Sequence, residues 1–101
     1  MTEITSKDIE VLQGFSLLEF GAAWCTHCQN AQPHIASTLK YYPHIKHIKI
    51  EDGKGKRLGR LYAVKLWPTL ILLNNGKEVN RVGRPNNTNE LTDLLNQTSL
   101  N

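Results

Sequence analysis

Both cysteines of the chain lie in the stretch Phe20-Gly21-Ala22-Ala23-Trp24-Cys25-Thr26-His27-Cys28. This stretch follows a nearly continuous apolar run, which is typical of a buried strand, and precedes a pattern with helical spacing. Two thiols separated by two residues on the first turn of a helix can close a small disulfide ring with little movement of the backbone. The stretch therefore indicates redox chemistry at the N-terminus of a helix.

The composition is that of a soluble globular protein. The chain has 101 residues, of which 40% are hydrophobic and 21% charged, and we expect residues 1–101 to form a single domain. The first residues do not resemble a secretory signal, and no apolar stretch approaches the roughly 20 residues of a membrane span. We therefore expect a cytoplasmic protein without membrane association, in which a cysteine pair is catalytic or metal-binding rather than a permanent crosslink.

The net charge is +3, and eleven of the twelve Lys and Arg residues lie between Lys40 and Arg84. We interpret this basic half as a solvated face, because its densest run, Lys54-Gly55-Lys56-Arg57, has no aromatic platform on which bases could stack. Nucleic acid is therefore not an expected partner, whereas acidic proteins are possible ones. The region 53–59 is rich in glycine but lacks the spacing of a phosphate-binding loop.

The rest of the sequence predicts alternating strands and helices. We expect a short helix after the caps in 5–8, stopped by Gly14, and at most a stub of strand at 3–5. The further elements are a strand at 15–20, a helix at 25–42 interrupted by Pro33, a strand at 44–50, a short helix at 58–64, strands at 67–73 and 78–82 joined by an Asn-Gly turn, and a last helix after 87–90. This order predicts an α/β fold with helices on both faces of one mixed sheet.

The motifs resemble those of the thioredoxin superfamily. The resemblance rests on Trp24-Cys25-Thr26-His27-Cys28, on Pro33, on Leu66-Trp67-Pro68-Thr69, and on Asn75-Gly76 and Gly83 in the later hairpin. It implies the thioredoxin fold, with a central mixed sheet of four to five strands, and a thiol–disulfide oxidoreductase that needs no bound cofactor. The implied partners are proteins that contain disulfides and a thioredoxin reductase or another electron donor. We expect a monomer.

Cys25 is predicted to be the nucleophile, since the N–H groups and the dipole at the start of a helix favour an anion. Cys28, one turn deeper, would then resolve the mixed disulfide. Typical thioredoxins have Gly-Pro where this chain has Thr26-His27. The positive charge of His27 would stabilise the thiolate and make the couple more oxidising. The direction of the physiological reaction stays open at this stage.

Two further catalytic assignments follow from the resemblance. Glu19 matches the buried acid of the family, which exchanges a proton with the second cysteine. Burial would raise the pKa of Glu19 and make it a base toward Cys28. Lys49 matches the lysine that pairs with this acid. The other three histidines, His34, His44 and His47, are interpreted as surface residues without a catalytic role.

The predicted substrate surface lies beside Cys25. The Trp67–Pro68 bond is expected to be cis, so that the Trp67 backbone can pair with an extended substrate segment. Trp24, Trp67, Gly83 and Arg84 would rim the same shallow groove.

Three alternatives compete with the redox interpretation. The cysteines could be structural, or they could bind zinc together with His44 and His47, fifteen residues further on. That spacing is one residue short for a zinc finger, and residues three apart on a strand point to opposite faces. The third alternative is a thioredoxin-fold interaction module, redox-inactive or regulatory, that docks a partner through Trp67 and the basic face.

Overall fold

The computed structural model describes residues 4–99. Its elements are α1 (Ser6–Glu10), β1 (Phe15–Gly21), α2 (Thr26–Leu39), β2 (Lys46–Glu51), α3 (Arg57–Leu61), β3 (Thr69–Asn74), β4 (Lys77–Gly83), α4 (Thr88–Leu95) and the 3₁₀ helix η1 (Asn96–Ser99). The predicted order of helices and strands is confirmed. The stub of strand is not found at Ile4 and Thr5, and Glu3 lies outside the described residues.

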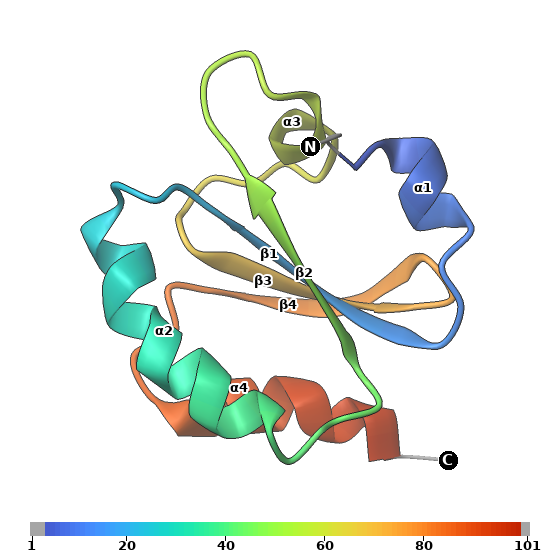
Figure 1. The fold of residues 1–101 in the computed structure, drawn as a ribbon, viewed down its shortest axis with the longest axis vertical. Helices are drawn as coiled ribbons and strands as arrows, with labels where there is room; N and C mark the ends of the chain where they lie inside the picture. The colour runs from blue at the N-terminus through green and yellow to red at the C-terminus, as the bar shows by residue number, and fades with distance from the viewer. Residues whose placement is uncertain (1–3, 100–101) are drawn as a thin grey trace.

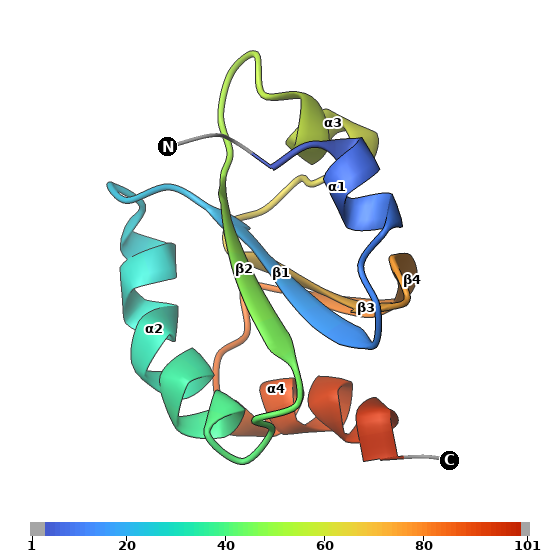
Figure 2. The same cartoon turned by 45° about the vertical axis from the view of Figure 1, so that its right-hand side comes forward.

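Four strands form one mixed sheet in the order β2-β1-β3-β4. The strand β1 is parallel to β2 and antiparallel to β3, and β4 returns antiparallel to β3. Helices α2 and α4 cover one face of the sheet, and α1 and α3 lie on the other (Figures 1 and 2). The chain thus has the α/β architecture with helices on both faces that its sequence predicts.

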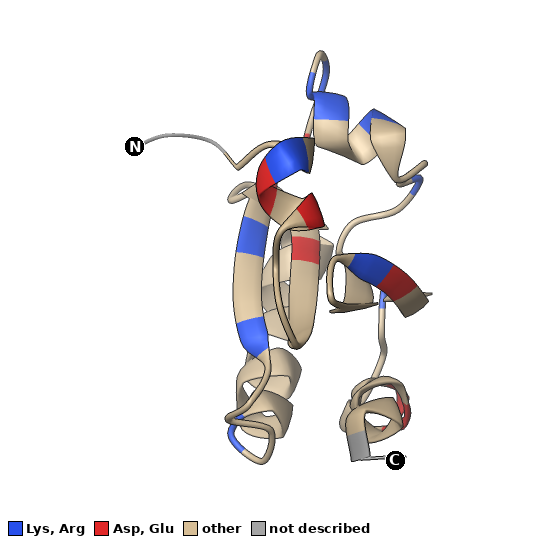
Figure 3. Ribbon diagram, turned by 90° about the vertical axis from the view of Figure 1, so that its right-hand side faces the viewer, with Lys and Arg blue, Asp and Glu red and all other residues tan. Residues whose placement is uncertain are grey.

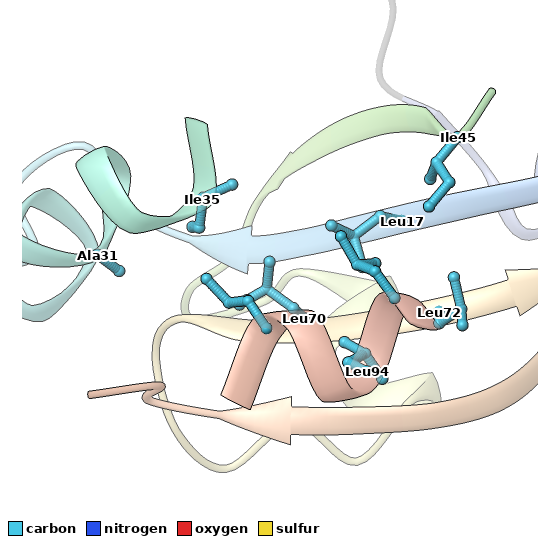
Figure 4. Packing of buried hydrophobic residues seen from close by; sticks show 9 residues of the cluster. Leu17, Ala31, Ile35, Ile45, Leu70, Leu72 and Leu94 are labelled. Atoms are coloured by element: carbon cyan, nitrogen blue, oxygen red, sulfur yellow. The ribbon is translucent and has the colours of Figure 1, made fainter. Parts of the chain in front are cut away.

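The two central strands are buried on both faces. In β1, Leu17 packs toward α2 and α4, while Leu18 packs toward α1 and α3. In β3, Leu70 and Leu72 pack toward α2 and α4 (Figure 4), and Ile71 packs toward the opposite side. This alternation of neighbouring side chains explains why both strands are apolar throughout.

Local caps fix the ends of the helices. Thr5 and Asp8 form a capping box at the start of α1, and the Asn87 side chain accepts the Glu90 N–H at the start of α4. The apolar residues of α4, Leu91, Leu94 and Leu95, are all buried. Leu17 and Ile35 belong to the same cluster, so α4 holds α2 and the sheet together below the cysteine pair.

Basic residues gather along one edge of the sheet. Lys46 and Lys49 belong to β2, and Arg57 and Arg60 to α3, so that positive charge follows β2 and α3 (Figure 3). All four side chains are exposed, which agrees with a solvated basic face. Among residues 4–99, no helix is long and apolar enough to cross a membrane.

Candidate active site

The cysteine pair lies where β1 ends and α2 begins. Cys25 is the N-cap residue of α2, and its Sγ accepts a hydrogen bond from the Cys28 backbone N–H at 3.3 Å. A cysteine therefore takes the place that Ser, Thr or Asp usually occupies at a helix start. Both cysteines are free thiols, and they are only 7% and 6% exposed.

The surroundings push the two thiols toward opposite protonation states. Burial opposes ionisation of Cys25, but hydrogen bonds from the Cys28 thiol and from the Cys28 and His27 backbone N–H groups, together with the charge of Arg84, lower its pKa. Burial raises the pKa of Cys28 to about 11, assisted by its hydrogen bond to Cys25 and by the nearby charges of Cys25 and Glu19. Of the two thiols, Cys25 therefore ionises more readily, and Cys28 keeps its proton to higher pH.

The positive side chain that acts on Cys25 is that of Arg84. The Arg84 Nε donates to the Trp67 carbonyl at 2.9 Å, and the Arg84 N–H donates to the Pro68 carbonyl at 2.8 Å. Arg84 also adopts a positive φ of 48°. His27 is exposed and supports the thiolate through its backbone N–H. The thiolate-tuning role of the His27 side chain stays a prediction.

Two tryptophans flank the thiolate. Trp24 is 73% exposed, and its ring meets that of Trp67 edge-to-face with centroids 5.3 Å apart. The Trp67 indole N–H donates to Asp52 Oδ2 at 2.9 Å, and its ring packs against the small cluster that contains Cys25 and Cys28. The hydrogen bond to Asp52, which follows β2, thus fixes the orientation of Trp67.

The Trp67–Pro68 peptide bond is cis, which agrees with the sequence-based expectation. Pro68 is buried, and Thr69 begins β3 directly after it. Gly83 pairs with Thr69 at the end of β4, and a side chain at Gly83 would approach Leu66 Cδ1 to 3.2 Å. The structure therefore brings Pro68, Gly83 and Arg84 together at one end of the β3–β4 hairpin.

Glu19 lies behind Cys28 and is only 6% exposed. Its Oε1 contacts His47 Nε2 at 2.7 Å, and its Oε2 accepts a hydrogen bond from Gln32 Nε2 at 2.7 Å. Burial would raise the pKa of Glu19, but the contacts with His47 and Gln32 and the charges of His47 and Lys49 lower it overall. The prediction of a raised pKa is wrong, because it did not include the contacts from His47 and Gln32.

Lys49 does not hold Glu19 directly in the way predicted. Its Nζ donates to Gln32 Oε1 at 3.1 Å, and the Gln32 amide in turn reaches Glu19, while the Lys49 charge acts on the carboxylate through space. The direct ionic partner is His47, whose side chain is 26% exposed. His47 is therefore not a mere surface residue, because it contacts the buried Glu19, while the expectation that it has no catalytic role is untested.

The sequence analysis missed three residues of the site, Gln32, His47 and Asp52. Gln32 stands one helical turn after Cys28, and His47 stands two residues before Lys49 on the same face of β2. Both spacings could have placed them beside Glu19. Asp52 carried no such signal, because its role depends on how the loop before Pro68 folds back.

The described residues 4–99 contain no group of three or more His, Cys, Asp and Glu side chains arranged to hold a metal ion. His44 Nε2 lies 3.0 Å from Thr98 Oγ1, and His47 contacts Glu19 instead of a cysteine. The two histidines of the hypothetical zinc site thus contact Thr98 and Glu19 and do not meet the two cysteines.

A pair of thiols two residues apart at a helix start, beside a cis-proline, defines a thiol–disulfide oxidoreductase as the class of protein. Residues 3–97 match the family model described as Thioredoxin. The chain belongs to the thioredoxin family.

Solved structures and curated sequences agree with this assignment. Reduced thioredoxin 2 from Pseudomonas aeruginosa PAO1 is 44% identical and superposes with a TM-score of 0.86, over 95% of this chain and 90% of that one. A thioredoxin of Chlamydia pneumoniae is 32% identical over 93% of this chain and 94% of its own length. Thioredoxin C-3 of Corynebacterium nephridii is 33% identical over 93% of this chain, which spans 61% of the length of that relative.

Proposed function

We propose that the protein reduces or exchanges disulfide bonds of other proteins by a dithiol mechanism in which Cys25 attacks and Cys28 resolves. The observation that carries this proposal is the N-cap position of Cys25, where its Sγ accepts the Cys28 N–H. A lowered pKa at Cys25 beside a pKa of about 11 at Cys28 supports the attacking role of Cys25 and the resolving role of Cys28.

The reaction proceeds in two exchanges. The Cys25 thiolate attacks one sulfur of the substrate disulfide, which forms a mixed disulfide and releases the first substrate thiolate. Cys28 then loses its proton and attacks Cys25 Sγ, which forms the Cys25–Cys28 disulfide and releases the second substrate thiolate. The substrate gains two electrons that the dithiol loses. Glu19 serves as the proton acceptor for Cys28.

The substrate would bind over the exposed Trp24 ring and beside the cis-proline. In this proposal an extended segment of the substrate contacts the backbone at Trp67 and Pro68, next to Gly83 and Arg84. The contact between Trp24 and Trp67 supports such a surface, because it offers an apolar wall at the thiolate.

The oxidised protein would be returned to the dithiol by a thioredoxin reductase or by another electron donor. We further propose that it acts as a monomer in the cytoplasm. The ordinary globular composition, with 40% hydrophobic and 21% charged residues, supports this proposal.

The proposal is tested by reduction of insulin with dithiothreitol as electron donor, followed by turbidity. We expect the wild-type protein to accelerate precipitation, and we expect Cys25→Ser to abolish the acceleration. Cys28→Ser should accumulate a mixed disulfide that mass spectrometry detects on Cys25. A Cys25→Ser variant that works at the wild-type rate would instead favour an interaction module whose cysteines are not used.

A further inference from the structure

The contact between Glu19 and His47 joins a buried group to one that reaches water. Glu19 Oε1 and His47 Nε2 lie 2.7 Å apart, and the side chains are 7% and 26% exposed. They come from the neighbouring parallel strands β1 and β2. A proton that reaches Glu19 therefore has a short path to the imidazole and from there to the surface.

The second oxygen of the carboxylate faces the cysteine helix. Gln32 Nε2 donates to Glu19 Oε2 at 2.7 Å and to the Cys28 carbonyl at 3.1 Å, so the Gln32 amide ties the carboxylate to the helical turn that carries Cys28. The Glu19 charge is close enough to raise the pKa of the Cys28 thiol. The carboxylate thus stands between Cys28 on one side and His47 on the other.

The charged and titratable groups that face this carboxylate are few. From β2 they are His47 and Lys49, and from α2 the titratable group is Cys28, with the neutral Gln32 beside it. The strand β3 presents Leu70 opposite Glu19. Lys49 is held by Gln32 Oε1 at 3.1 Å and keeps its positive charge at neutral pH. His47 is the member of this group whose ring nitrogens can both accept and release a proton.

We propose that His47 is the outlet for the proton that Cys28 loses when it resolves the mixed disulfide. This inference rests on the proposed dithiol mechanism. The proton passes from Cys28 Sγ to the Glu19 carboxylate, and the Glu19–His47 pair then holds it as a carboxylate beside an imidazolium. His47 releases one proton to water, which restores the pair. His47 acts through Glu19 and is a positioning residue and proton acceptor rather than a residue that touches the substrate.

A histidine suits this place for a chemical reason. Its unperturbed pKa of about 6.5 lets it take up and release a proton near neutrality, and its two ring nitrogens allow one to face Glu19 while the other exchanges with solvent. A lysine would stay charged and could not accept a proton. The pair therefore accepts the Cys28 proton only when the imidazole is neutral, so resolution should become faster as the pH rises.

The two exchanges can be separated with Ellman's reagent. Attack by Cys25 releases the first equivalent of thionitrobenzoate, and resolution by Cys28 releases the second, so stopped-flow absorbance gives both rates between pH 5 and 9. We expect His47→Gln to slow the second phase at pH 7 by roughly tenfold or more. We also expect it to remove the inflection near neutrality from the second phase and to leave the first phase unchanged.

Four further variants distinguish proton transfer through His47 from a purely structural role. His47→Lys keeps a cation beside Glu19 but cannot accept a proton, so it should lose the same inflection even though the fold is preserved. Glu19→Gln should slow the second phase, and adding His47→Gln to it should cost no more. His34→Gln, a matched change at a half-buried histidine of α2 that is not part of this network, should leave both phases unchanged.

Unchanged second-phase profiles in both His47 variants would overturn the inference and leave the dithiol mechanism intact. A loss of rate that is equal at all pH values would also overturn it, since that result indicates a structural role only. Wild-type protein that releases a single equivalent of thionitrobenzoate would overturn the dithiol mechanism itself, and this inference with it.

Discussion

The Sγ atom of Cys28 occupies the space that a side chain at Gly21 would need. A Cβ atom built on Gly21 would lie 2.6 Å from this sulfur, which is closer than such atoms approach. The backbone of Gly21 is not in the left-handed region, so glycine is required here by space rather than by conformation. The end of β1 thus approaches the Cys28 thiol closely.

Gly21→Ala should therefore destabilise the reduced protein by about 1–3 kcal/mol through overpacking. Urea unfolding under reducing conditions measures this cost. In a Cys28→Ala background the same substitution should cost much less, because the sulfur that it meets is gone. An equal cost in both backgrounds would show that Cys28 is not the obstacle.

Cys25 should react with iodoacetamide at lower pH than an ordinary thiol, because its pKa is lowered, whereas Cys28 should stay unmodified until close to pH 11. Peptide mass spectrometry at each pH assigns the label. Arg84→Gln should move the Cys25 profile to higher pH, since it removes a nearby positive charge. Labelling of Cys28 before Cys25 would contradict the assignment of roles.

His27→Pro should make the protein more reducing, because proline removes the backbone N–H that stabilises the Cys25 thiolate. Position 27 lies in the first turn of α2, where proline is compatible with the helix. A lost hydrogen bond to a charged group, about 1.5–3 kcal/mol, corresponds to roughly 30–60 mV in equilibrium with glutathione. The matched control is His27→Ala, which keeps the N–H and should shift the potential less. A larger shift in the alanine variant would assign the effect to the imidazole.

Asp52 and Trp67 should be energetically coupled. A double-mutant cycle with Asp52→Ala and Trp67→Phe isolates the hydrogen bond from the indole N–H to the carboxylate. We expect a coupling free energy of roughly 1–3 kcal/mol in chemical unfolding, because the acceptor is charged. Strictly additive changes would mean that the bond does not contribute to stability.

Glu19 should make the folded protein sensitive to acid. The pKa of Glu19 is lowered in the folded state, so its ionised form stabilises the fold above the ordinary value of 4.5, and this contribution is lost as the pH falls from there through the folded-state pKa. Glu19→Gln should therefore reduce stability at pH 7 and should differ little from wild type in strong acid. Chemical unfolding at a series of pH values measures both effects.

Glu78→Gln is the control for this experiment. The hydrogen bond with Arg81 lowers the pKa of Glu78 as well, but the pair lies on the surface and exposed ion pairs contribute only about 0–1 kcal/mol. The effect of Glu78→Gln on the free energy of unfolding should accordingly change little with pH. If the surface variant lost as much stability as Glu19→Gln, burial of the carboxylate would not be the cause.

The elements of the fold could be predicted because their signals are local. The apolar runs of β1 and β3, the capping residues at Thr5 and Asn87, and the Asn-Gly turn each act within a few residues. The boundaries were less certain. The helix α2 ends at Leu39 rather than at Tyr42, since residues with helical spacing continue into the turn before β2.

The site could be predicted only where its residues are close in the sequence or belong to a known motif. Cys25, Cys28 and Pro68 were found in this way. The partner of Glu19 was misplaced by two residues, because strand alternation puts His47 and Lys49 on the same face, and only the side-chain geometry decides which of them reaches the carboxylate. The pKa of Glu19 was predicted in the wrong direction for the same reason.

The edge-to-face contact between Trp24 and Trp67 has a spectroscopic consequence. The chain contains two tryptophans, and both lie in this contact beside Cys25. Tryptophan emission from this protein thus originates entirely at the active site, without a background from the core. Oxidation of the thiols, or binding of a substrate that covers Trp24, should therefore change the tryptophan fluorescence. No attached label is needed to follow either event.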